Sequence, residues 1–262
     1  MMILRLALAV AISAYATAQP ASTSSLVTYI FGDSLTEVGN NNYLQYSLAR
    51  ADFPYYGVDF SGGKATGRFT NGRTIGDIIS TKLGIPSPPP YLSLSQNDDA
   101  FLSGINYASG GAGILNETGI YFIQRLTFND QINCFKKSKE VIRAKIGDGA
   151  ANKHVNDAMY FIGLGSNDYV NNFLQPFMAD GQQYTHDEFV ELLTSTLNNQ
   201  LTVLFQPTSH FHFLLFLYQK YQNRARDSSE QIGWSSALSF FFQHYYYYIL
   251  SQYIYTFCLL SQ

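Results

Sequence analysis

The chain has 262 residues, of which 46% are hydrophobic and 13% are charged, and its formal net charge is −3. This length holds one full α/β domain or a smaller domain with appended segments, and the composition supplies ample core material. Because the charge is slightly acidic and no basic stripe is present, the sequence gives no electrostatic reason to expect nucleic acid as a partner.

The first residues are typical of a secretory signal. A positively charged start, Met1–Arg5, precedes an apolar run to Ala16 and the small residues Ala16-Thr17-Ala18 of a cleavage site. The apolar run is too short to span a bilayer. We therefore predict a signal peptide over residues 1–18 and a secreted, extracellular chain that begins near Gln19.

Export has two consequences for later residues. It would make Asn116-Glu117-Thr118 a candidate acceptor for N-glycosylation, although the motif says nothing about occupancy. It would also place Cys134 and Cys258 in an oxidising compartment. Two cysteines do not form a framework, and the sequence does not decide whether they pair.

Three short apolar runs predict parallel strands. They lie at residues 27–31, 105–108 and 158–164, and small or polar residues follow each of them directly. Apolar residues at helical spacing predict helices over residues 74–83, which Gly84 would end, and over 188–205. A third helix is expected within residues 120–146, with Phe122, Ile123, Leu126 and Ile132 on its inner side.

Residues 40–73 alternate Gly, Asn, Pro and aromatic residues, which indicates a long ordered loop region. Loops of this length inside a compact domain are usually functional. Arg68 and Arg73 could contact an anionic ligand there, but a solvated or salt-bridged arginine is the favoured interpretation.

The three turns after the predicted strands supply groups of complementary chemistry. Ser34 brings a hydroxyl, the glycine-rich residues 109–113 bring backbone N–H groups, and Asn167 brings a carboxamide. Repeated strand, turn and helix units favour parallel strands with right-handed crossovers, so these turns should meet at the carboxyl edge of one sheet. A serine beside fixed donors suits acyl transfer, although Ser34 alone would be interpreted as a helix N-cap.

The motifs at these turns resemble one known family over residues 26–205. Phe31-Gly32-Asp33-Ser34-Leu35 with Glu37–Asn42, then Asn106–Gly113, then Gly165–Tyr169 are similar to the conserved blocks of plant GDSL-type esterase/lipases in the SGNH hydrolase superfamily. The resemblance implies a three-layer αβα fold with a flavodoxin-like sheet. It also implies Ser34 as nucleophile and an oxyanion hole formed by Ser34, Asn167 and a glycine. That glycine is Gly113 or Gly111, and we take Gly113.

The last block of the family is missing. Its Asp-x-x-His motif supplies the catalytic base, but no histidine in this sequence has an aspartate three positions before it. The sequence also shows no pattern for the last two strands of the family fold, so we expect a sheet that is incomplete at its C-terminal side. Replacement of the base by His210, His212 or His244 is not favoured, because a general base needs a defined orientation.

Residues 206–262 form an aromatic-rich segment with runs such as Tyr245–Tyr248, and no charged residue follows Trp234. Such runs are typical of a translated T-rich non-coding stretch, and they indicate a truncated or mis-spliced product. The rival interpretation is a membrane-associated tail, against which the many Tyr, Gln and Ser residues argue. Residues 19–205 are therefore predicted as a partial hydrolase-like domain.

The function implied by the resemblance is serine-dependent hydrolysis of acyl esters, impaired by the missing histidine. The substrate would be a small-molecule or lipid ester, and no metal or cofactor is expected. The alternative is a non-catalytic family member, either a binding module that uses the oxyanion pocket or a product without function.

Overall fold

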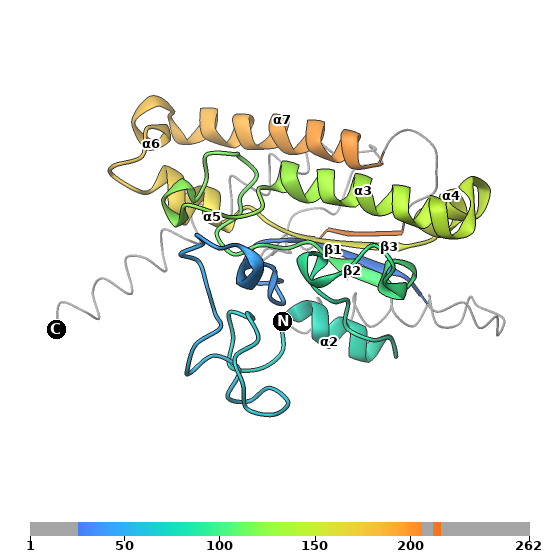
Figure 1. Ribbon diagram of the computed structural model, residues 1–262. Helices are drawn as coiled ribbons and strands as arrows, with labels where there is room; N and C mark the ends of the chain where they lie inside the picture. The colour runs from blue at the N-terminus through green and yellow to red at the C-terminus, as the bar shows by residue number, and fades with distance from the viewer. Residues whose placement is uncertain (1–25, 206–211, 216–262) are drawn as a thin grey trace, which may run out of the picture.

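The computed structural model of the chain describes residues 26–205 and 212–215, which form a parallel sheet covered by helices (Figure 1). The strands are β1 (Thr28–Gly32), β2 (Gly104–Asn106), β3 (Met159–Gly163) and β4 (His212–Leu215). Their order is β2-β1-β3-β4, and all three pairings are parallel. The predicted α/β class with a parallel sheet is confirmed.

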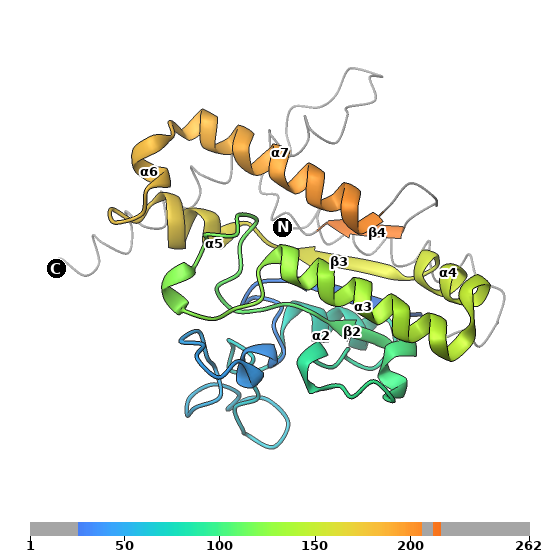
Figure 2. The same ribbon diagram turned by 45° about the horizontal axis from the view of Figure 1, so that its top comes forward.

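Helices lie on both faces of this sheet, and Figure 2 shows the same layers after a rotation. The α-helices are α2 (Ile75–Lys82), α3 (Phe128–Ile146), α4 (Asp148–Asn156), α5 (Ser166–Asp168), α6 (Asp180–Gln183) and α7 (His186–Phe205). Short 3₁₀ or π turns occur at Asn40–Tyr43, Tyr91–Ser93, Asp99–Leu102, Ile120–Phe122 and Tyr169–Phe173.

Alternation along β1 divides its side chains between the two layers. Ile30 packs with Phe161 and with Ile79 of α2 on one face. Tyr29 and Phe31 point to the opposite face and join the larger core beneath α3 and α7. This division follows from the two-residue period of a strand, and it explains why an unbroken apolar run suits a central strand.

The larger core is unusually aromatic around β1. Phe31 stacks on Tyr107 with ring centroids 4.9 Å apart, and Tyr29 contacts Phe135 of α3 at 4.9 Å and Tyr160 of β3 at 5.5 Å. Each such buried side chain contributes about 1.5–3 kcal/mol through removal of apolar area from water. The central strand, and with it the turn that follows Gly32, is therefore firmly held.

The structure corrects the predicted start of the long helix. Helix α3 begins at Phe128, after a capping box in which Thr127 and Asp130 exchange hydrogen bonds. Phe122, Ile123 and Leu126 precede the helix, and Ile123 is 63% exposed with φ of 66°. The apolar spacing led the prediction to include residues 120–127, which lie before the helix. The capping box at Thr127 marks the observed start.

Three further differences concern unpredicted elements. Gly147, with φ of 80°, ends α3, and α4 follows directly.

Ser34 lies in a single turn and does not begin a helix. The next element after it is the 3₁₀ segment Asn40–Tyr43. Strand β4 adds to the sheet beyond residue 205, where no strand was expected. Its parallel pairing with β3 becomes possible because α7 returns the chain along the sheet.

Residues 1–18 and almost all of 206–262 lie outside the described residues. The signal peptide, the nature of the aromatic-rich segment, the C-terminal incompleteness of the sheet and the pairing of Cys134 with Cys258 therefore stay predictions. Within the described part of the chain, no helix has both the length and the hydropathy required to cross a membrane.

Candidate active site

The three predicted turns meet at the carboxyl edge of the sheet, as expected. The N–H of Asp33 donates to Gly163 O (3.1 Å), and the N–H of Ser109 donates to Gly32 O (3.0 Å). The hydroxyl of Ser166 donates to Asp33 Oδ2 at 2.9 Å. These bonds join the turn after β1 to the turns after β2 and β3, so the groups that follow the strands share one edge.

In the turn that carries Ser34, most backbone N–H groups donate hydrogen bonds to Asp33. The N–H groups of Thr36 and Glu37 donate to Asp33 O, and the N–H of Leu35 donates to Asp33 Oδ1 at 3.0 Å. Within the described residues, neither the N–H nor the hydroxyl of Ser34 makes a hydrogen bond. Ser34 is half-buried, so both groups are positioned yet available to a reactant.

Gly32 permits this turn to approach β3 closely. Its φ is 152°, and a Cβ atom at this position would lie 2.3 Å from Gly163 O. Any side chain at residue 32 would therefore clash with the backbone. Gln131 of α3 fixes the same residue, because its carboxamide accepts from Gly32 N and donates to Gly32 O, both at 2.9 Å.

The loop over residues 109–115 uses its N–H groups selectively. Those of Ser109 and Ala112 donate to backbone oxygens. The N–H of Gly110 donates to Glu37, and those of Ile114 and Leu115 donate to Asp168 at 2.8 and 3.0 Å. Within the described residues, Gly111 and Gly113 are left as the two loop residues whose N–H groups make no hydrogen bond.

These are the two glycines that sequence reasoning left open as oxyanion donors, and the hydrogen bonds do not decide between them. A Cβ atom at Gly113 would lie 2.4 Å from Thr118 Cγ2 and 2.6 Å from Asp168 Oδ1. A Cβ atom at Gly111 would lie 2.5 Å from Phe122 Cδ2. Both positions therefore require glycine for close packing, and a substitution at either one would disturb the loop.

Asn167 of α5 is oriented by its neighbours. Its Nδ2 donates to Ala112 O at 2.8 Å, and its Oδ1 accepts from Asn171 Nδ2 at 2.5 Å. The Tyr121 hydroxyl donates in turn to Asn171 Oδ1 at 2.5 Å. Because the Nδ2 group has two hydrogens, one remains after the bond to Ala112. The carboxamide is thus held with a spare donor beside the glycine loop.

Three buried carboxyl groups surround these turns. Burial raises the pKa of Asp33 and of Asp168 to about 6, although hydrogen bonds to each carboxylate oppose this effect. Burial raises the pKa of Glu37 to about 8 against the bonds from Asn41 and Gly110. Each carboxyl accepts hydrogen bonds from loop groups, and none is bonded to Ser34 within the described residues, so these groups hold the turns of the site in place.

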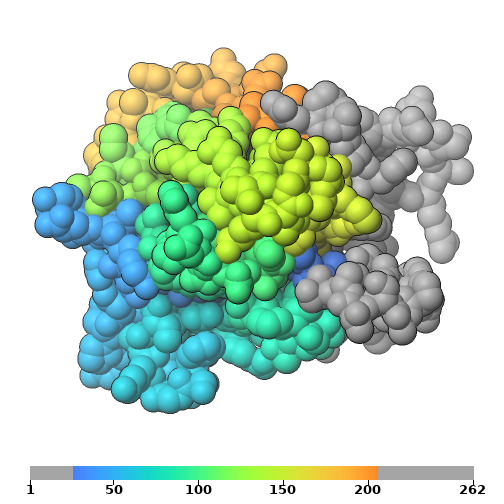
Figure 3. All heavy atoms as spheres, turned by 45° about the vertical axis from the view of Figure 1, so that its right-hand side comes forward, coloured from blue at the N-terminus to red at the C-terminus, as the bar shows by residue number. Residues whose placement is uncertain are grey.

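Neither histidine with a described side chain is hydrogen-bonded to Ser34. His154 lies on α4, which leads into the start of β3 and therefore lies at the amino end of the strands. Figure 3 turns this side of the molecule, the right-hand side of Figure 1, toward the viewer. His186 begins α7, and the centroid of its ring lies 6.2 Å from that of Tyr169 and 6.5 Å from that of Phe173. His210 and His244 lie outside the described residues, as does the side chain of His212.

Of the two arginines of the loop region, Arg68 is salt-bridged and Arg73 is exposed to solvent. Arg68 donates from Nε and Nη2 to the two carboxylate oxygens of Asp77, at 2.7 and 2.9 Å. Its guanidinium also lies 4.5 Å from the centre of the Phe60 ring. Arg73 donates to Thr81 Oγ1 at 3.2 Å. These contacts attach the loop region to α2.

Sequence reasoning missed Gln131 and Asn171, and it assigned no role to Glu37 or Asp168. Asn171 follows Asn167 by four residues, so helical spacing could have suggested a contact. Gln131 acts on Gly32 across 99 positions of sequence, and no local pattern indicates that contact.

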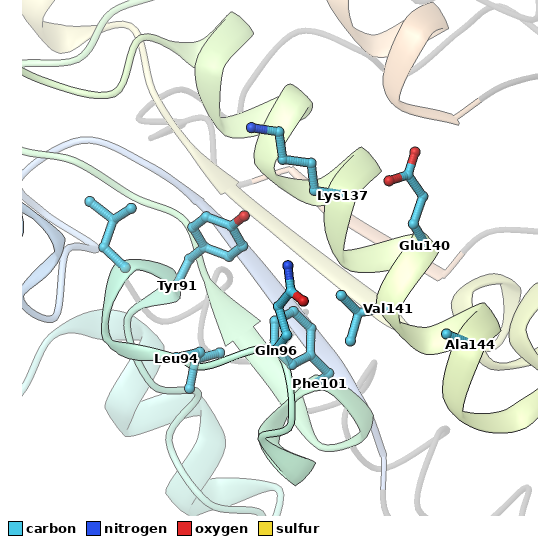
Figure 4. Close-up of a pocket in the computed structure, with 9 residues that line it drawn as sticks. Tyr91, Leu94, Gln96, Phe101, Lys137, Glu140, Val141 and Ala144 are labelled. Atoms are coloured by element: carbon cyan, nitrogen blue, oxygen red, sulfur yellow. The ribbon is translucent and has the colours of Figure 1, made fainter.

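A hollow of about 640 Å³ lies between α3 and the segment that precedes β2 (Figure 4). Its lining residues are Tyr91, Leu92, Leu94, Gln96, Phe101, Lys137, Glu140, Val141 and Ala144. None of them belongs to the three turns, so this hollow is separate from the candidate active site. In the described part of the chain, no three His, Cys, Asp or Glu side chains gather as metal ligands would.

Comparison with known proteins agrees with this geometry. A sequence model described as GDSL-like Lipase/Acylhydrolase matches residues 29–231, so the match continues beyond residue 205, the predicted end of the resemblance.

Three curated relatives are GDSL esterase/lipases of Arabidopsis thaliana. One is 95% identical over 206 residues, which are 79% of this chain and 58% of that protein. A second is 52% identical over 180 residues, and a third is 44% identical over 184; each alignment covers 68% of this chain and 49% of the relative. The chain spans about half the length of the curated relatives it matches.

Proposed function

Because the chain belongs to the GDSL-like lipase/acylhydrolase family, we propose that its candidate site is built for serine-dependent hydrolysis of carboxylic acyl esters. Ser34 is the nucleophile. The N–H groups of Ser34 and Gly113 and the side chain of Asn167 form the oxyanion hole. One observation carries this proposal: within the described residues, the N–H groups that make no hydrogen bond in residues 33–37 and 109–115 are those of Ser34, Gly111 and Gly113, which include the donors expected to bind an oxyanion.

In the proposed reaction, Ser34 Oγ attacks the ester carbonyl carbon and its proton passes to a base. The carbonyl oxygen becomes an oxyanion that accepts from the free N–H groups and the spare Asn167 hydrogen. The carbon–oxygen bond to the alcohol then breaks as the base returns its proton to the alcohol oxygen. Water attacks the acyl-serine, which releases the carboxylic acid and restores the Ser34 hydroxyl. Fixed donors at such an oxygen contribute about 3–4 kcal/mol each to the lowering of the barrier.

The base of the family is a histidine of the Asp-x-x-His motif, which the 262-residue sequence does not contain. Removal of a nucleophile or base from a catalytic triad lowers turnover by on the order of a million-fold, and about a thousandfold acceleration over water remains. We therefore propose that the chain by itself hydrolyses esters slowly.

Exposed apolar side chains near the turns favour an apolar acyl group. Leu35, next to Ser34, is 61% exposed, and Ile120 and Ile123, which follow the glycine loop, are 58% and 63% exposed. An acyl chain that covers them would remove apolar area from water. Among lipid, acetylated sugar and small ester substrates, this surface is most compatible with a lipid ester.

The alternative is a non-catalytic protein that binds a ligand through the same donors. The lack of a hydrogen-bonded base at Ser34 within the described residues favours this alternative. We also propose that the chain is exported, a proposal that rests on the composition of residues 1–18.

A fluorophosphonate probe distinguishes the enzyme from the binding module, because it reacts with an activated serine. Because the base of the family is missing, we expect slow labelling of the full chain, which is lost in Ser34→Ala and retained in Ser195→Ala, a change at an exposed serine of α7. Asn167→Ala should slow labelling about a hundredfold. If folded wild-type protein is not labelled, the enzyme proposal is wrong and the binding module remains.

A further inference from the structure

We propose that Asn116 carries an N-linked glycan and that the glycan is added before the surrounding loop folds. The proposal rests on the proposed export of the chain. Asn116-Glu117-Thr118 is the one Asn-x-Ser/Thr motif in the sequence, so a single site is at issue. The structure adds two observations that the motif alone does not contain: the Asn116 acceptor is exposed, and the Thr118 hydroxyl is buried.

The acceptor side chain is open to solvent. Asn116 is exposed, and its Oδ1 accepts a hydrogen bond from Asn129 Nδ2 at 3.0 Å. Its own Nδ2 makes no hydrogen bond within the described residues. A sugar on this nitrogen would replace one hydrogen, keep the bond to Asn129 and point away from the core. The folded protein therefore has room for the product of the modification.

The hydroxyl of the motif is, by contrast, inaccessible. Thr118 is 0% exposed. Its Oγ1 donates to Asp168 Oδ1 at 2.7 Å and accepts from Asn172 Nδ2 at 3.2 Å, so both functions of the hydroxyl are in use. Arg125 also holds the motif backbone, because it donates to Asn116 O at 2.5 Å and to Thr118 O at 2.6 Å.

The order of events follows from this contrast. Recognition of the motif requires its Ser or Thr hydroxyl, which the folded loop commits to Asp168. The amide nitrogen of Asn116 must attack the anomeric carbon of an oligosaccharide linked to a polyprenyl diphosphate. As the carbon–nitrogen bond forms, the bond from that carbon to the diphosphate oxygen breaks, and the amide proton passes to a base of the transferase. Transfer must therefore precede closure of the loop onto Asp168.

Translation of the full chain with endoplasmic-reticulum microsomes tests the site. We expect one mobility shift that endoglycosidase H reverses, that is lost in Asn116→Gln and Thr118→Val, and that remains in Thr118→Ser. Asn198→Gln changes an exposed asparagine outside the motif and should keep the shift. Protease protection reports import independently, and a parallel chain carries a known signal sequence in place of residues 1–18. An imported, protected chain without a shift would overturn the proposal.

A second arm tests the order. Full-length chain made without glycan is offered to the transferase either folded or freshly diluted from urea. The folded protein should be modified about tenfold less, because access then depends on local opening of the loop. Equal modification of the two samples would show that burial of Thr118 does not control transfer. Neither arm measures ester hydrolysis, so the outcome is independent of activity at Ser34.

Discussion

Two buried carboxyl groups hold opposite ends of the glycine loop by different means. Glu37 accepts from Gly110 at the start of the loop, and Asp168 accepts from Ile114, Leu115 and Thr118 at its end. Asp168 has three donors for its charge, and its pKa is raised to about 6, whereas Glu37 has two and its pKa is raised to about 8. At neutral pH the end of the loop is therefore held by a carboxylate and its start by a largely protonated acid.

Substitution of Asp168 should have the largest effect. Asp168→Ala leaves two buried N–H groups and the Thr118 hydroxyl without their acceptor, and each such loss costs about 1–3 kcal/mol. We expect the free energy of unfolding in urea to fall by about 3 kcal/mol or more. Asp187→Ala, at an exposed carboxylate of α7, should change it by less than about 0.5 kcal/mol. Equal effects of the two substitutions would contradict the assigned role of Asp168.

Glu37 should make the free energy of unfolding depend on pH. Its folded pKa lies above its unfolded value, so the folded state binds more protons, and this contribution to stability is lost as pH rises toward about 8. The slope is about 1.4 kcal/mol per pH unit for one proton. Asp33 and Asp168 act in the same direction but only up to about pH 6.

Above pH 6 the slope should therefore come mainly from Glu37. Glu37→Gln should flatten the dependence of the unfolding free energy on pH between about 6 and 7.5, and Glu191→Gln, an exposed change on α7, should not. A variant Glu37→Gln with an unchanged slope would assign the proton uptake to another group.

Asn171 tests whether Asn167, a proposed oxyanion donor, needs a neighbour to orient it. Asn171→Ala removes the bond that fixes Asn167 Oδ1, and we expect the rate of fluorophosphonate labelling at Ser34 to fall about tenfold, as for other residues that orient a functional side chain. Asn171→Asp cannot donate and should not restore the rate. A loss of stability with unchanged labelling would show a structural role alone, and Asn198→Ala is the matched exposed control.

Substitution of Asp52, a surface carboxylate, should change the free energy of unfolding least. Asp52 pairs with Arg50 at a surface where each side chain is 31% exposed. Exposed pairs contribute about 0–1 kcal/mol because water and salt screen them. Asp52→Ala should lower the unfolding free energy by about 0.5 kcal/mol or less in urea denaturation. A loss as large as that of Asp168→Ala would mean that this loop region is as tightly coupled as the site.

The parts of the fold that sequence reasoning found are those with local causes. Aromatic and β-branched runs around Tyr29 and Phe161 locate two central strands, and their small-residue turns locate the shared edge. The predicted start of α3 was wrong because Phe122 packs against the glycine loop at Gly111 and Ile123 is exposed, so neither side chain extends the apolar face of the helix. Glu37 was seen as part of a motif, yet its bond to Gly110 spans 73 positions and has no local signature.

The contact of Gln131 with Gly32 has a consequence for how the chain matures. Strand β1 is made early, yet its neighbours β2 and β3 begin at Gly104 and Met159, and the side chain that holds its last residue belongs to α3. During synthesis the serine turn therefore lacks its partners in β3 and α3 until more than half of the described chain has left the ribosome. The most local of the motifs is completed by some of the most distant partners in the chain, and such non-local topology is expected to fold slowly.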